Sequence, residues 1–229
     1  MTTKRQIKAL AAPLLARNPG LALVGSYSIW FPPTGNVVRE IIIDRSSDPD
    51  RFQLRWHLTE CFLPEGYDGG AFGRCSSFIF RTEARRDGWL WSDSAMADDF
   101  VVRCERDVIP ILEPLDTDRK RLEFARSHPG SRGRYGWTWH LMTEIALGNL
   151  DDARAIWLEN GAFYEAGHIF ECRRDQKTYD RYRQLGPPLL ADDRAALMNL
   201  LRVWITENAV GSRHAAFWTR EPLPIEDFV

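Results

Sequence analysis

Residues 51 to 63, RFQLRWHLTECFL, alternate between apolar and polar side chains, and this alternation constrains the fold more than any other stretch. Phe52, Leu54, Trp56 and Leu58 occupy the even positions, and polar residues occupy the odd positions between them. Successive side chains of a strand leave opposite faces, so the pattern predicts a strand with one apolar and one polar face.

Two further strands are predicted before this one, over residues 21–31 and 37–44. The turns that join them, at 32–36 and 46–50, contain Pro, Gly, Asn and Asp, the residues that favour tight turns. Short turns between strands indicate an antiparallel meander. Strands at 74–80 and 89–91 would bring the sheet to four or five strands.

Most of the remaining chain has helical periodicity. A first helix is predicted at 4–17, and after residue 94 apolar side chains recur at three- and four-residue spacing. Further helices are expected over 100–115 with a kink at Pro110, over 116–128, over 163–183 with an end at Gly186-Pro187-Pro188, and over 192–211. The sequence therefore predicts an α+β fold. Residues 1–93 would form a helix and an antiparallel sheet, and residues 94–229 a helical half packed on it as one compact unit.

The segment 137–160 predicts a helical hairpin, with a turn at Gly148-Asn149. Trp137, Gly148, Ala153 and Trp157 stand at the spacing of the large, turn, small and aromatic positions of a tetratricopeptide motif, so the segment resembles one such hairpin. The next period falls on Tyr182, where the motif has Gly, and the closing Pro is missing. A solenoid needs about three repeats, so we expect a single helix pair and no peptide-binding array.

Composition indicates an ordinary soluble protein. The chain has 229 residues, 44% of them hydrophobic, and a net charge of −2, which disfavours nucleic acid as a partner. Its first twenty residues make a poor signal peptide and contain no span long enough to cross a membrane. Four widely spaced cysteines without an export signal predict reduced thiols and a cytoplasmic location.

The polar face of the strand at 51–63 is the first candidate site. Arg55, His57, Thr59 and Cys61 stand at alternate positions, and a Cys–His pair can produce a thiolate nucleophile. Residues four apart on a strand are about 13 Å apart, so His57 would need a partner other than Cys61. The alternative is a polar sheet face that is solvated or covered by helices.

A second candidate is a metal site at His168, Glu171 and Cys172, three ligand types that would share one face of a helix. The same His-x-x-Glu-Cys pattern occurs at His57, Glu60 and Cys61, where it falls on a strand and divides between two faces. No Cys-x-x-Cys or His-Glu-x-x-His spacing supports zinc, so we expect neither a metal nor another cofactor.

No nucleotide-binding or hydrolase motif is present. The glycines between Gly66 and Gly73 lack the Lys and hydroxyl of a phosphate-binding loop. The nine Trp residues suit a protein core or an interface. The order of elements is similar to that of small bacterial families with a meander before a helical region, and of some toxin-immunity proteins. We therefore expect a non-catalytic module that binds another protein or itself. The alternative is a small hydrolase or transferase that uses His57 and Cys61.

Overall fold

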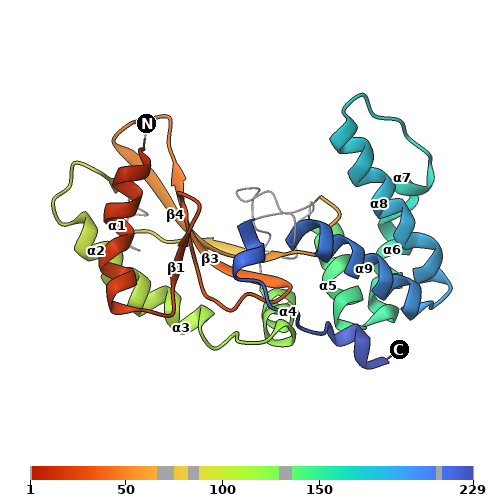
Figure 1. Cartoon of the computed structure of the whole chain (residues 1–229). Helices are drawn as coiled ribbons and strands as arrows, with labels where there is room; N and C mark the ends of the chain where they lie inside the picture. The colour runs from red at the N-terminus through yellow and green to blue at the C-terminus, as the bar shows by residue number, and fades with distance from the viewer. Residues whose placement is uncertain (1, 66–74, 82–87, 129–135, 210–212, 229) are drawn as a thin grey trace.

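The computed structural model of the chain describes residues 2–65, 75–81, 88–128, 136–209 and 213–228. An antiparallel sheet occupies the N-terminal part and a mostly helical half follows, which confirms the predicted α+β class (Figure 1). One apolar core cluster includes residues of the sheet and of the later helices alike. None of the described helices combines the length and apolar character needed to cross a membrane.

The sheet is built around two long central strands. Its order is β1-β2-β3-β4-β5, and β6 pairs with the other end of β4. All pairs are antiparallel, and Glu40 on β3 lies opposite His57 on β4. The strand bounds are Ala22–Val24, Ser28–Trp30, Val37–Arg45, Arg51–Glu60, Cys75–Phe78 and Trp89–Leu90 for β1 to β6.

The single strand predicted at 21–31 is wrong, because the structure has a small hairpin there. Strands β1 and β2 pair with each other, with Ala22 opposite Trp30. Gly25 between them has a φ of 67°. This left-handed conformation is accessible to glycine at no steric cost, so the chain reverses where the alternation alone suggested that it continued.

Helices α1 to α4 lie in the same part of the molecule as the sheet (Figure 1). Helix α1 spans Lys4–Arg17 as predicted, and Thr3 and Gln6 form a capping box at its start. The helix predicted over 100–115 is instead divided into α2 (Met96–Arg103), a π-helical turn (Cys104–Val108) and α3 (Ile109–Leu112). Pro110, which cannot donate a helical hydrogen bond, is the second residue of α3, two positions after that turn. Helix α4 is Asp118–Ser127.

Helices α5 to α9 lie together at the other end of the molecule from α1 and α2 (Figure 1), and we call them the helical lobe. The predicted helical hairpin consists of α5 (Trp137–Leu147) and α6 (Leu150–Asn160), and Gly148 ends α5 with a φ of 82°. The lobe is completed by α7 (Ala162–Glu165), α8 (Arg173–Leu190) and α9 (Arg194–Ala209).

Two expectations for α8 are wrong. Residues 166–172 are not helical, so no helix extends from 163 to 183, and α8 passes through Gly186, Pro187 and Pro188 before it ends. The prolines stand in the last turn, where little helix remains to be broken. A Cβ on Gly186 would lie 2.7 Å from Cζ2 of Trp157. Gly186 therefore serves the close packing of α8 on α6 and does not end the helix.

A C-terminal strap, residues 213–228, crosses from the helical lobe to the sheet and back. The Thr34 N–H donates to Phe217 O (3.0 Å), and the Thr219 N–H donates to Thr34 O (2.8 Å). Asn36 donates to Glu221 O (2.6 Å). The 3-10 turn η4 (Pro224–Phe228) then packs on α5 and α9, so the strap connects the sheet end of the molecule with the helical lobe.

Candidate functional site

A buried polar cluster lies on the sheet face that carries His57. The Glu40 carboxylate accepts hydrogen bonds from Ser28 Oγ, from Trp30 Nε1 (3.1 Å) and from Thr59 Oγ1 (2.9 Å). His57 Nδ1 lies 3.9 Å from Glu40 Oε1. Glu40 and His57 are both buried, whereas Arg51 and Gln53 on the same face are exposed, so this face is covered around His57 and solvated near the start of β4.

His57 and Cys61 are poorly suited to nucleophilic chemistry. Burial, with the nearby Arg55, lowers the pKa of His57 to about 3, and neither ring nitrogen has a hydrogen-bond partner in the described part of the chain. Strand β4 ends at Glu60, so Cys61 lies beyond the row of polar side chains that begins with Arg55. Burial raises the pKa of the Cys61 thiol well above its usual range, which disfavours the thiolate. Arg55 pairs with Asp44 at 2.5 Å.

The candidate metal ligands His168, Glu171 and Cys172 lie on the exposed segment between α7 and α8. They are not on a helix, so the shared face expected from the sequence does not form. Across the described ranges, no group of three His, Cys, Asp or Glu side chains is placed to hold a metal ion. The glycine-rich stretch at 66–73 lies outside the described residues.

The segment between α7 and α8 instead presents an apolar side chain to solvent. Ile169 is 93% exposed. The backbone on both sides of it is held, because the His168 N–H donates to Tyr179 Oη (2.9 Å) and the Phe170 N–H donates to Gln176 Oε1 (2.8 Å). Aromatic rings support this segment: Phe163 stacks on His168 with centroids 4.9 Å apart. Ile169 therefore projects from a well-anchored position.

A groove runs along the surface between α8 and α9. Its apolar part has a volume of about 830 Å³, lined by Gln184, Pro187, Pro188, Ala191, Asp193, Ala196, Asn199, Leu200 and Val203. A basic part adjoins the apolar part and shares Gln184 and Val203 with it. This basic part has a volume of about 540 Å³, and its lining also includes Arg173, Lys177, Arg181, Trp204 and Glu207. We call the two parts together the α8–α9 groove.

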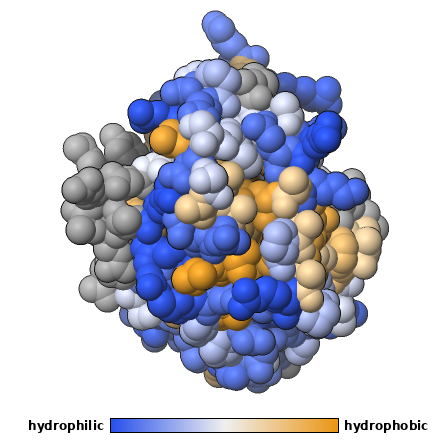
Figure 2. Space-filling model, turned by 90° about the vertical axis from the view of Figure 1, so that its left-hand side faces the viewer, coloured by the Kyte–Doolittle hydropathy of each residue, from blue (hydrophilic) through white to orange (hydrophobic). Residues whose placement is uncertain are grey.

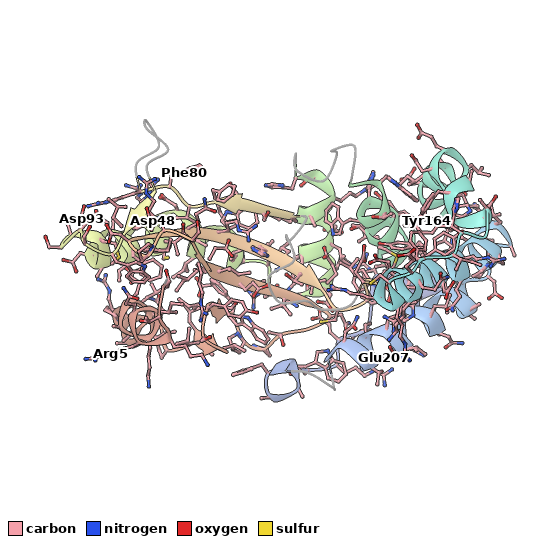
Figure 3. All side chains as sticks on the ribbon, turned by 90° about the horizontal axis from the view of Figure 1, so that it is seen from above. Arg5, Asp48, Phe80, Asp93, Tyr164 and Glu207 are labelled. Carbon is pink, nitrogen blue, oxygen red and sulfur yellow. The ribbon has the colours of Figure 1, made fainter. Side chains whose placement is uncertain are left out.

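Exposed apolar side chains concentrate in this lobe. Of the nine large hydrophobic residues that are exposed in the described ranges, five lie on α6 to α9 or their connections: Leu158, Phe163, Ile169, Leu190 and Val203. Figure 3 shows Tyr164 and Glu207 in this lobe, with Arg5 and Asp93 at the opposite end. Figure 2 looks onto that opposite end and shows an apolar area there that is bordered largely by hydrophilic residues.

Sequence reasoning missed both the groove and the Glu40 cluster. Arg39 and Glu40 stand between apolar residues in the stretch 37–43, and two charged residues in a central strand were the available signal. The groove was missed because Pro187 and Pro188 were interpreted as a helix break, although residues 184, 187, 188 and 191 have the spacing of one helical face.

A scan against protein-family models, a search of curated proteins and a search of solved structures each found no match to this chain.

Proposed function

We propose that the protein is a non-catalytic module that binds another protein through the α7–α9 end of its helical lobe. The observation that carries this proposal is Ile169, an almost fully exposed aliphatic side chain on a backbone that hydrogen bonds hold in place. Single exposed apolar residues are common on protein surfaces, but clusters of them mark interaction sites. Phe163 and Val203, 48% and 52% exposed, belong to the same end of the molecule.

A well-ordered apolar projection suits an interface because little conformational entropy is lost when it is covered. Ile169 would act as an anchor, next in the chain to His168 and Phe170, whose rings both pack on Phe163. The four cysteines form no disulfide, which supports a reducing compartment such as the cytosol as the place of action.

Photo-crosslinking in the cells that produce the protein tests this proposal. A photoreactive amino acid at position 169 should give a discrete adduct with one protein. The same photoreactive amino acid in place of Arg5, at the far end of the molecule (Figure 3), should give none. Purified partner should then bind the wild-type chain about 30-fold more tightly than Ile169→Asp, the loss typical of an interface anchor.

Position 102 provides a second control, because Val102 is 51% exposed on α2, which lies at the opposite end of the molecule from α7 and α8 (Figure 1). Adducts at 102 with none at 163, 169 or 203 would contradict the assignment to the helical lobe. Unchanged affinity of Ile169→Asp for the purified partner would do so as well.

A further inference from the structure

The α8–α9 groove has the geometry of a site for a third helix. Its walls are rows of side chains at three- and four-residue spacing: 184, 187, 188 and 191 on one side, and 196, 199, 200 and 203 on the other. The two helices are joined by residues 191–193, and Lys177 lies 3.4 Å from Glu207 near the end of α9, so they run in opposite directions. Such a pair of rows leaves a furrow into which the side chains of another helix can pack.

The apolar part of the groove is built for close approach. Ala191 and Ala196 are small, and Pro187, Leu200 and Val203 present apolar atoms, whereas Asp193 is the one charged residue among the described residues that line this part. Val203 is 52% exposed. Covering these side chains would release water from apolar surface, which favours association.

The other part of the groove carries an excess of positive charge. Arg173, Lys177 and Arg181 line it together with Asp180 and Glu207. Arg181 and Lys177 both pair with Glu207, whereas Arg173 forms no ion pair with any residue in the described ranges. Arg173 and Lys177 lie one helical turn apart near the start of α8, where the helix dipole also favours an anion.

We propose that the α8–α9 groove binds an amphipathic helix of a partner protein, with its apolar stripe on Leu200 and Val203 and its acidic end against Arg173 and Lys177. This inference rests on the proposed function and specifies the partner's binding element. A helix fits better than an added strand, because strand addition needs the unpaired backbone groups of a sheet edge, and both walls of this groove are helices.

A displayed library of random peptides, selected on the whole purified protein, tests the inference without a known partner. Peptides of about 16 residues would span about 24 Å as a helix, close to the length of α8. Selection should enrich sequences with apolar residues at i, i+3 or i+4, and i+7, with Asp or Glu beyond one end of this apolar stripe.

Three variants then assign the site. Val203→Glu should weaken binding of an enriched peptide by about 30-fold or more. The matched control Val102→Glu, at a valine that is 51% exposed on the far end, should change it less than about twofold. The double variant Arg173→Glu, Lys177→Glu should lose about tenfold for the acidic peptide and prefer a version of it with Lys at the acidic positions. Unchanged thermal unfolding confirms that each variant is folded.

Several outcomes would overturn the inference. The selected peptides could lack the amphipathic pattern, or Val203→Glu could leave the affinity for an enriched peptide unchanged. The double variant Arg173→Glu, Lys177→Glu could also bind the acidic peptide as tightly as the wild type. Dimers in native mass spectrometry that Val203→Glu abolishes would make a second copy of this chain the occupant and refute the partner-helix assignment. If crosslinking at 169 identifies a partner while the groove variants bind it normally, only this inference fails. If groove peptides bind but crosslinking finds no partner in cells, the proposed function fails.

Discussion

Acid should destabilise this protein through His57 in particular. His57 is fully buried on β4, and burial together with Arg55 lowers its pKa from 6.5 to about 3. The Glu40 carboxylate lies 3.9 Å from Nδ1, and its negative charge would raise the pKa of His57, opposite to the effect of burial. In the unfolded chain the imidazole is free to bind a proton near pH 6.5. Below that pH, unfolding takes up a proton that the folded protein does not bind.

The magnitude follows from linkage between protonation and folding. Each unit of pKa difference is worth about 1.4 kcal/mol, so the full shift corresponds to about 5 kcal/mol. The stabilisation is present above about pH 6.5 and is lost as the pH falls toward about 3. Between about pH 7 and pH 4 the contribution of His57 to the free energy of unfolding should fall by about 3 kcal/mol.

Urea unfolding followed by tryptophan fluorescence measures this effect across that range. Carboxylates also contribute to the pH dependence, so the decisive quantity is the difference between the wild-type chain and His57→Gln, whose side chain does not titrate. The free energy of unfolding of His57→Gln should fall by about 3 kcal/mol less than that of the wild type between about pH 7 and pH 4. Parallel profiles for the two proteins would refute the reasoning, whatever their absolute stabilities.

Two other predictions concern packing and thiol reactivity. Gly186→Ala should lower the free energy of unfolding by about 1–3 kcal/mol, because the added Cβ would lie 2.7 Å from Trp157 Cζ2. In the control Gly20→Ala, the new Cβ would have no other part of the protein within 4 Å, so the free energy of unfolding should change by less than about 1 kcal/mol. Denaturant titrations that give the same loss for both variants would contradict this account. A thiol reagent should label Cys172 alone in the folded protein, since the other three cysteines are buried; rapid labelling of native Cys172→Ser would refute this.

Periodicity was a good guide wherever one face of an element is buried. The alternation from Phe52 to Leu58 predicted strand β4, and the helical stripes predicted α5, α6 and α9. Such patterns record which side of an element faces the core. They also separated the sheet from the helical half of the chain.

The same reasoning failed where tertiary contacts decide. Gly186 has the local character of a helix terminator, yet Trp157 occupies the space beside it. Nothing near residue 57 in the sequence indicates that its polar face is buried with Glu40. The exposed position of Ile169 depends on Tyr179 and Gln176, which hold the backbone around it from the next helix. Local propensity contains none of this information.

The C-terminal strap has a consequence for the order of folding. Its hydrogen bond from Asn36 to Glu221 O joins residues 185 apart in sequence. Closing a free loop of that length costs about 5 kcal/mol in chain entropy, whereas the short turn between β3 and β4 costs only about 1–2 kcal/mol. The strap should therefore dock after the sheet and the helical lobe have already come together. Substitutions that weaken only the strap would then accelerate unfolding and leave the folding rate almost unchanged.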